Sequence, residues 1–272
     1  MIVGSNDFER RRWNDERWAA LWPRRERLTD PVTEHLLDAL ALRQGARVLE
    51  VGSGGGKAAL AAARAVGAEG SVVGADLSAP LNKLAEQRRG EAGAENVRFC
   101  LADMQTDAVG GGPFDAAMSQ FGVMFFDEPT VAFSNIRAHL EPDGRIAFAC
   151  WQSIEQNPWF FGPAIQSFVP PPPEPPPGKS PTGPFTLADP EQTTAILETA
   201  GFTDVRRTPH RLDVVAPEDS ILDEAQLVFL GVSEDELQAA KDAVVEYMKP
   251  LKLDGDLARF PLAFQIFQAR NQ

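Results

Sequence analysis

The chain has 272 residues, of which 43% are hydrophobic, and it carries a formal net charge of −13 at pH 7. A chain of this length and apolar content can bury a full core, which excludes global disorder. The negative charge repels nucleic acid phosphates and anionic lipid, so neither nucleic acid nor a membrane surface is the expected partner. A small, neutral or cationic molecule fits better, and the oligomeric state stays open.

The two cysteines, Cys100 and Cys150, each end an apolar segment that is expected to be a strand. Their spacing matches neither a metal site nor a disulfide framework, so both are predicted to be buried free thiols. The N-terminal segment lacks the long apolar region of a secretion signal, and no stretch approaches the roughly 20 apolar residues of a membrane span. A cytoplasmic protein without a metal site is expected.

Two helices are predicted before the first strand. The first covers residues 6–27 and carries Trp18 and Trp22 four residues apart, on one face. The second begins after a cap at Thr29 or Asp30 and is apolar along one side.

From residue 47 onward, short apolar runs alternate with longer helical patterns. The expected strands are 47–51, 71–75, 97–101, 114–118 and 145–150, and the expected helices between them are 57–66, 80–89 and 128–140. Strands that are apolar on both faces and are followed by helices indicate a parallel sheet that is covered on both sides. The pattern therefore predicts a doubly wound α/β domain.

After residue 151 the rhythm changes. The segment VPPPPEPPPGKSPTGP favours extended polyproline conformations and is expected to be a surface connection, a flap or an inert spacer. The elements predicted beyond it are a helix at 189–200, a strand at 202–215, helices at 219–230 and 233–248, and a last strand at 260–270.

Residues 48–60, with the sequence VLEVGSGGGKAAL, place four glycines between an apolar strand and an alanine-rich helix. A strand, a glycine-rich turn and a helix in this order bring backbone N–H groups and the positive end of the helix to one point. A phosphate-binding P-loop would need other residues at Val51 and Ala58, so that class of ligand is excluded.

The dinucleotide fingerprint is satisfied by Gly54, Gly56 and Ala59, with Asp76 twenty residues beyond Gly56. An NAD(P)-dependent oxidoreductase therefore remains an alternative. Glu50, however, lies inside the strand, where a carboxylate costs free energy unless it meets a donor or a cation. It would repel a pyrophosphate, whereas a ligand with an ammonium group and a sulfonium would suit it.

At EVGSGGG, residues 50–56, the chain resembles the class I S-adenosylmethionine-dependent methyltransferases, of the small-molecule (type 11-like) kind. Further matches are Asp76 in VVGADLS, Asp103 in CLADMQT, and the strand and loop FDAAMSQFGVMFF. The segments HLEPDGRIAFACW and LETAGFTDV match the approaches to the family's fifth and sixth strands. The resemblance covers about residues 36–215 and the last strand.

The resemblance implies S-adenosylmethionine as cofactor and S-adenosylhomocysteine as product. In the family, an acid in the place of Asp76 takes both ribose hydroxyls, and one in the place of Asp103 reads the adenine edge with the next N–H. Both aspartates could also cap the helices that follow them. The implied cofactor-binding residues are Glu50, Gly52, Ser53, Gly54, Gly56, Asp76, Leu77, Ala102, Asp103, Met104, Ser119, Gln120 and Phe121.

The fold implied by the resemblance is a doubly wound, mostly parallel, seven-stranded Rossmann-like sheet whose last strand is antiparallel. We expect an N-terminal helical lid at 1–30 and a methyltransferase domain at 31–272. Within that domain, a proline-rich insertion is expected at 152–186 and a helical lid insertion at 217–250.

The implied reaction is methyl transfer, by in-line displacement, to an oxygen, nitrogen or carbon of a small and rather apolar molecule. Such a reaction needs alignment and exclusion of water rather than a protein nucleophile. Aromatic side chains mark the expected acceptor pocket: Trp13, Trp18, Trp22, Phe121, Phe125, Phe126, Trp151, Trp159, Phe160 and Phe161.

A general base would help if the acceptor carried a proton. His35 and His210 are candidates to which we do not commit, whereas His139 is expected to lie away from the glycine loop. A non-catalytic protein that binds the cofactor is the third alternative, beside the methyltransferase and the oxidoreductase.

Overall fold

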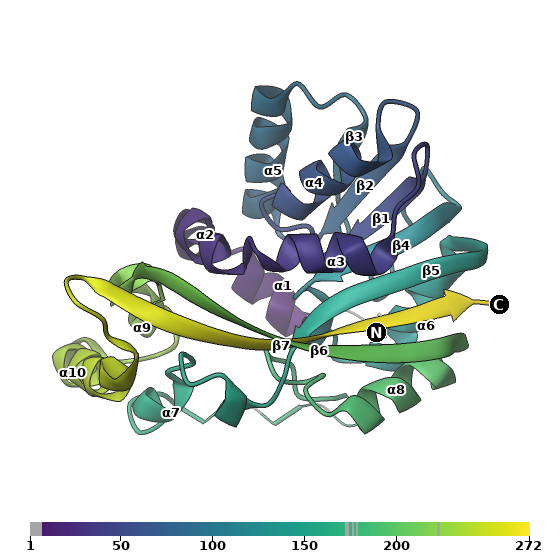
Figure 1. The fold of residues 1–272 in the computed structure, drawn as a ribbon. Coiled ribbons are helices and arrows are strands. Elements are labelled where there is room, and N and C mark those ends of the chain that lie inside the picture. Colours follow the sequence, from purple (N-terminus) through teal and green to yellow (C-terminus); the bar gives the residue numbers. More distant parts are fainter. Residues whose placement is uncertain (1–6, 172–173, 176, 178, 222–223) are drawn as a thin grey trace.

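The computed structural model describes residues 7–171, 174–175, 177, 179–221 and 224–272. Its centre is a seven-stranded sheet with the strand order β3-β2-β1-β4-β5-β7-β6, in which β7 runs antiparallel to both of its neighbours (Figure 1). The strands are β1 (Arg47–Val51), β2 (Ser71–Asp76), β3 (Val97–Leu101), β4 (Phe114–Gln120), β5 (Leu140–Trp151), β6 (Phe202–Pro217) and β7 (Leu257–Asn271). The predicted doubly wound sheet with an antiparallel last strand is confirmed.

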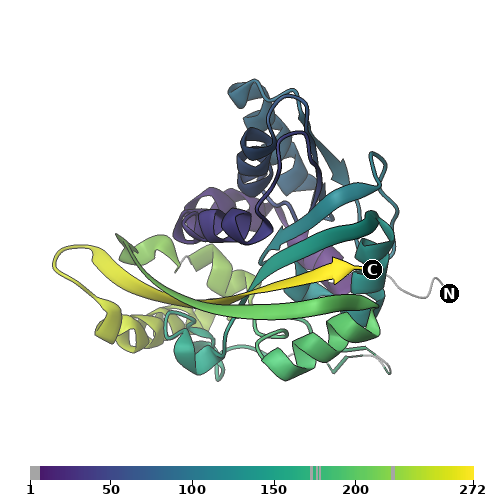
Figure 2. The same ribbon diagram turned by 45° about the vertical axis from the view of Figure 1, so that its right-hand side comes forward.

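Helices flank the sheet in two groups. The main ones are α3 (Val32–Leu40), α4 (Lys57–Val66), α5 (Ala79–Ala92), α6 (Pro129–Ala138) and α8 (Pro190–Thr199). Helix α3 contacts α4, and α6 contacts α8; Figure 2 shows α3 and α8 on opposite sides of β5, β7 and β6. Because both faces are covered, residues 48–51 of β1 are all buried, as the continuous apolar run predicted.

The single helix predicted at 6–27 is wrong, because the structure has two helices there. Helix α1 (Asp7–Trp13) ends before Asn14, and α2 (Glu16–Thr29) begins after Asp15, whose carboxylate accepts the N–H of Arg17 as a helix cap. The sequence predicted no break because Asn14 and Asp15 fit a polar helix face. Residue 6 lies outside the described residues.

Some predicted boundaries also need correction. Helix α3 has Pro31 at its N-cap without a side-chain cap bond, not Thr29 or Asp30. Helix α6 ends at Ala138 because Leu140 already pairs with Phe114 in the sheet. Cys150 is fully buried, but Cys100 is only half-buried, although both thiols are free.

The last two strands are longer than predicted and pair along their whole length, from Phe202 opposite Asn271 to Pro217 opposite Leu257. They extend past the sheet and carry the insertion helices α9 (Glu224–Phe229) and α10 (Leu237–Met248) (Figure 1). Both helices were predicted to start earlier, but 218–220 and 234–236 form 3₁₀ turns. Residues 222–223 of the first predicted helix lie outside the described part.

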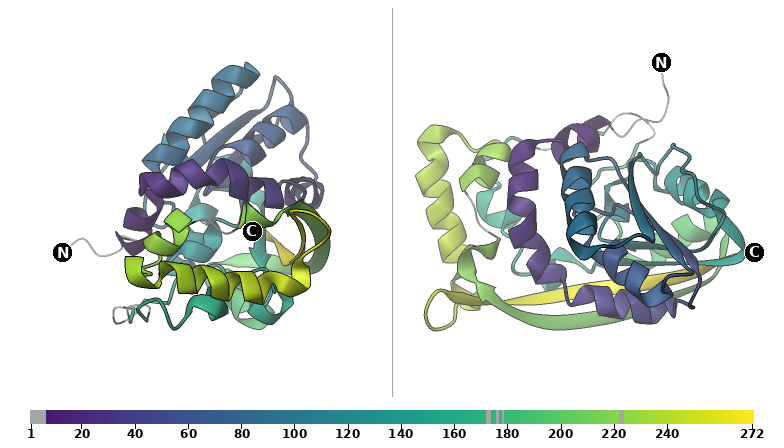
Figure 3. Two further views of the ribbon diagram at one scale, coloured as in Figure 1. Left: turned by 90° about the vertical axis from the view of Figure 1, so that its left-hand side faces the viewer. Right: turned by 90° about the horizontal axis from the view of Figure 1, so that it is seen from above.

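Helix α2 lies between the insertion and the helices of the first half-sheet (Figure 3). It contacts α9 on one side and α5 on the other, while the short helix α7 (Gly162–Ile165) packs against α10. No helix among the described residues has the length and apolar character that a membrane crossing requires. Elements from both ends of the chain thus meet over the carboxyl edge of the sheet.

Candidate active site

The loop between β1 and α4 approaches its neighbours more closely than a side chain would allow. Gly52 has φ +69°, and a Cβ built on it would lie 2.8 Å from the Cα of Gly122, in the loop after β4. Gly54 has φ +50°, and its Cβ would lie 2.9 Å from the ring of Trp22. The glycines therefore allow the loop to pack closely against the loop after β4 and against Trp22 of α2.

Glu50 is a buried carboxylate without a countercharge among the described residues. Its side chain is 1% exposed, and its Oε2 has no hydrogen-bond partner. Burial and the nearby Asp76 raise the pKa of Glu50 well above 4.5. A hydrogen bond from the Ala59 N–H lowers this pKa only in part. A buried acid in this state is costly unless a cation joins it, and none of the described residues supplies one.

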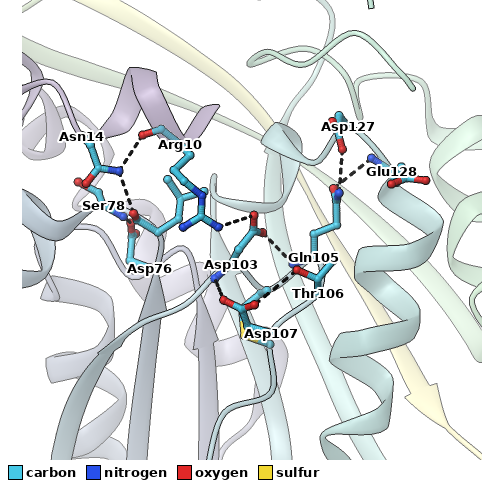
Figure 4. Close-up of polar contacts among 12 residues, drawn as sticks. Arg10, Asn14, Asp76, Ser78, Asp103, Gln105, Thr106, Asp107, Asp127 and Glu128 are labelled. Carbon is cyan, nitrogen blue, oxygen red and sulfur yellow. Dashed lines mark hydrogen bonds and ion pairs between the residues drawn. The ribbon is translucent and has the colours of Figure 1, made fainter. Parts of the chain in front are cut away.

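Asp76 and Asp103 lie at the ends of β2 and β3 (Figure 4). Asp76 accepts the N–H groups of Gly54 (2.7 Å) and Ser78 (2.8 Å), and burial raises its pKa. Asp103 is fully buried and accepts the N–H of Gln105 at 3.0 Å. Helix α5 is capped by Ser78 rather than by Asp76, so helix capping does not account for this carboxylate.

Two adjacent cavities open at this edge. Cavity 1, of about 600 Å³, is lined by Trp13, Trp22, Val51, Gly52, Gly54, Ala75, Asp76, Leu77, Leu81, Ala102, Asp103, Met104, Gln120, Phe121, Gly122, Phe125 and Phe126. Cavity 2, of about 990 Å³, is lined by Trp13, Trp22, Arg25, Glu26, Leu28, Thr29, Asp30, Glu50, Gly52, Ser53, Gly55, Lys57, Ala58, Gln120, Phe121, Met124, Phe125, Trp151, Trp159, Ile221 and Leu262. The rings of Trp13, Trp22, Phe121 and Phe125 border both.

The structure brings together all but two of the predicted site residues, since each of the others lines cavity 1 or cavity 2. Gly56 instead begins α4 with φ +81°, where a Cβ would strike Phe99 at 2.6 Å. The buried Ser119 accepts the N–H of Gly122 with its hydroxyl, at 3.2 Å. These two residues shape the loops rather than the cavity walls.

Most of the aromatic side chains that were expected to mark the acceptor pocket lie together at the two cavities. Trp13 packs edge-on against Trp22 and Phe125, with ring centroids 5.8 and 5.1 Å apart, and Phe121 stacks on Trp151 at 4.0 Å. Three of the predicted rings, Trp18, Phe160 and Phe161, line neither cavity.

The three histidines line neither cavity. His35 and His210 lie 4.8 Å apart and pack on Phe264, which separates them from Phe121. His139 accepts the Val109 N–H at 3.0 Å and directly precedes β5, so it lies at the opposite edge of the sheet from the glycine loop.

Helix α1 is held over cavity 1 by hydrogen bonds that sequence reasoning missed. Asn14 donates to the carbonyl of Leu77 (3.0 Å) and accepts the N–H of Ala79 (2.9 Å). Arg10 reaches Asp103 at 3.3 Å (Figure 4). The polar Asn14 could have suggested the break between the two helices. Its partners could not have been predicted, because they lie more than 60 residues away in the sequence.

We expect Asn14→Ala to loosen α1 without unfolding the domain. The change removes three side-chain hydrogen bonds, those to the carbonyls of Arg10 and Leu77 and that from the Ala79 N–H, a loss of about 1–2 kcal/mol. Hydrogen exchange should then speed up at least about fivefold in residues 7–13 and stay unchanged in β1. Asn96→Ala, which removes comparable bonds to Ala63 and Gly67 far from α1, is the matched control. Equal exchange in both variants would contradict the assignment.

Within the described residues there is no cluster of His, Cys, Asp and Glu that could hold a metal ion.

Residues 48–144 match the family described as "Methyltransferase domain". The nocamycin O-methyltransferase of Saccharothrix syringae is 37% identical over 117 residues, which are 43% of this chain and 41% of the relative. The aklanonic acid methyltransferase of Streptomyces sp. (strain C5) is 30% identical over 118 residues, which are 43% of this chain and 54% of the relative. The matched segment thus spans about half the length of these relatives.

Among solved structures, phosphoethanolamine N-methyltransferase 2 of Haemonchus contortus, in complex with S-adenosylhomocysteine, superposes with a TM-score of 0.56 at 18% identity. The match covers 89% of this chain and 52% of that one. The resemblance to methyltransferases that the sequence predicted is confirmed: residues 48–144 match a methyltransferase domain, and the Rossmann-like sheet described above is similar to that of a solved methyltransferase.

Proposed function

We propose that the protein transfers a methyl group from S-adenosylmethionine to an oxygen, nitrogen or carbon of a small, rather apolar molecule. The observation that carries this proposal is Glu50, a buried carboxylate without a countercharge among the described residues, which lines cavity 2 two positions before Gly52, a residue that borders both cavities. An amino acid ammonium supplies the missing charge, and a dinucleotide pyrophosphate does not. This contrast disfavours the NAD(P)-dependent alternative.

The residues of cavity 1 fit the rest of the cofactor. The Asp76 and Asp103 carboxylates are acceptors for ribose hydroxyls and for the adenine amino group, and the apolar side chains of Leu77, Ala102 and Met104 lie beside them. When bound, S-adenosylmethionine supplies a methyl group that its sulfonium has already activated. The chain then has to hold the acceptor in line and exclude water, for which the aromatic walls of cavity 2 are suited.

The domain boundaries belong to this proposal. Residues 1–30 act as a lid over the cofactor, and residues 217–250 close the acceptor side, because α2 and α9 are in contact above the cavities. Cavity 2 argues against a protein that only binds the cofactor, since such a protein needs no second compartment. A small-molecule partner in the cytoplasm fits the net charge of −13.

Calorimetry with S-adenosylhomocysteine tests the proposal directly. We expect binding by the wild type, and a loss of about 1–3 kcal/mol in Asp76→Ala because ligand hydroxyls lose their acceptor. Asp115→Ala is the matched control, since Asp115 also accepts a backbone N–H, that of Arg47, but lies at the opposite end of the sheet. A thermal-shift comparison with NAD and NADP separates the oxidoreductase. Absence of heat at millimolar S-adenosylhomocysteine would refute the proposal.

A further inference from the structure

One positively charged side chain in the wall of cavity 2, that of Arg25, has no role in the proposed cofactor site. Arg25, on α2, lines cavity 2 but not cavity 1, and its guanidinium lies 4.6 Å from the ring centroid of Trp18. Burial and the neighbouring Arg12 lower its pKa to about 10. A guanidinium is seldom placed in such surroundings unless an anion joins it.

No carboxylate of the described residues pairs with Arg25. Its polar partner is the side-chain amide of Gln226 on α9. In the amide orientation that satisfies both of its polar atoms, the oxygen of Gln226 accepts a hydrogen bond from Arg25 Nη2 at 2.8 Å. The second guanidinium nearby, that of Arg12, lies 5.5 Å from the same Trp18 ring, but it pairs with the buried Glu9 at 3.6 Å. Among the described residues, Arg25 therefore remains a cation at the wall of cavity 2 without an acid of its own.

The acids of cavity 2 are engaged elsewhere or lie apart from Arg25. Glu26 binds Arg88 of α5 and, at 3.5 Å, Lys57; Asp30 binds Lys57 at 2.8 Å. Successive residues of α2 thus face opposite ways: Glu26 faces α5 and the glycine loop, while Arg25 faces α9 of the insertion. Figure 3 shows α2 between these two parts of the fold.

Because Arg25 faces α9 and not the glycine loop, it lies apart from the place where the charged groups of the cofactor are expected. The carboxylate of the cofactor's methionine portion is on the same carbon as the ammonium that Glu50 attracts. It therefore falls beside the glycine loop, where Lys57 and the positive end of α4 are the nearby positive groups. Away from the glycine loop, the lining of cavity 2 includes the apolar side chains of Trp151, Ile221 and Leu262.

We propose that the methyl acceptor is an apolar molecule carrying a carboxylate or another oxyanion, and that Arg25 binds this anion. The inference rests on the proposed methyltransferase function. Where the bound oxyanion is itself the acceptor, its lone pair forms the O–CH₃ bond as the S–CH₃ bond breaks and leaves its electron pair on sulfur. No proton has to be removed, which agrees with the position of all three histidines outside the cavities. A guanidinium offers two parallel N–H donors to a carboxylate, which fixes its orientation.

The test uses the full chain saturated with S-adenosylhomocysteine and follows binding by calorimetry. The probes are three carboxylates of increasing size, benzoate, 2-naphthoate and anthracene-2-carboxylate, each paired with its uncharged amide. We expect the wild type to bind at least one carboxylate at least tenfold more tightly than the matching amide. Arg25→Gln should remove this preference, and Arg25→Lys should keep part of it.

Arg24→Gln is the matched control, because Arg24 precedes Arg25 on the same helix, pairs with Asp219 and lines neither cavity. It should bind the carboxylates like the wild type. Equal binding of acids and amides, no binding of any acid, or an unchanged preference in Arg25→Gln would overturn the inference. Weaker S-adenosylhomocysteine binding in Arg25→Gln would assign Arg25 to the cofactor instead. Failure of the wild type to bind S-adenosylhomocysteine would refute the proposed function itself.

Discussion

Replacing Glu50 by glutamine is expected to stabilise the free protein and to weaken its binding of S-adenosylhomocysteine. The wild-type carboxylate is buried, has an unpaired Oε2 and has a pKa raised well above 4.5. Glutamine removes the cost of burying a charge, which we expect to add about 1–3 kcal/mol to the free energy of unfolding at pH 8. It also removes the partner of the ligand's ammonium, a loss of about 2–5 kcal/mol in binding.

The stability difference between Glu50→Gln and the wild type should depend on pH. Because the pKa of Glu50 is higher in the folded state, the folded protein holds this proton more tightly than the unfolded chain does. The stability contributed by the protonated group is fully present below about pH 4.5 and is lost as the pH rises toward the folded-state pKa. The advantage of Glu50→Gln should therefore be small at pH 5 and larger at pH 8.

Denaturant unfolding at both pH values, together with calorimetry in buffers of different ionisation enthalpy, checks this prediction. Because the ammonium favours the charged form of Glu50, binding should release more protons in the wild type than in the variant. Glu141→Gln is the control, since Glu141 pairs with Arg47 at the opposite end of the sheet. A variant that is less stable at pH 8, or that binds S-adenosylhomocysteine normally, would show that Glu50 has another role.

The sequence predicts this site well wherever the chemistry is local. Residues 47–51 are apolar on both sides and lie before four glycines, so a buried strand and a ligand-binding turn follow from neighbouring residues alone. Glu50 is recognisable because an acid in such a strand has no local reason to be there. The strand order and the antiparallel β7, in contrast, came from the family resemblance, since local patterns do not determine which strands become neighbours.

The sequence fails where distant segments complete the site. Asn14 fits a polar helix face, and only its contacts with Leu77 and Ala79 explain why the helix breaks there. Arg25 was missed for the same reason, although it follows Trp22 by three residues and so lies on the same side of α2. The surroundings of Arg25 depend on where α9 packs, some 200 residues later in the sequence. Helical periodicity does not predict that packing.

Gly52→Ala is expected to lower both stability and cofactor affinity, because two independent costs meet at this position. The first is the left-handed backbone conformation, φ +69°, which costs a residue with a Cβ about 1–2 kcal/mol. The second is steric, since the new Cβ would lie 2.8 Å from the Cα of Gly122, a backbone atom that cannot rotate away. Overpacking of this kind adds about 1–3 kcal/mol, so the total expected loss is about 2–5 kcal/mol.

Gly93→Ala separates the two costs, because Gly93 ends α5 with φ +59° and has no atom within 4 Å of a built Cβ. It should lose only the conformational part, and its binding of S-adenosylhomocysteine should be normal. Denaturant unfolding measures the first effect and calorimetry the second. If both variants lost the same stability, the contact between the tips of β1 and β4 would be loose. If Gly52→Ala bound S-adenosylhomocysteine normally, the methionine portion would not lie against the loop at Gly52, and the placement of the cofactor along Glu50 would have to be abandoned.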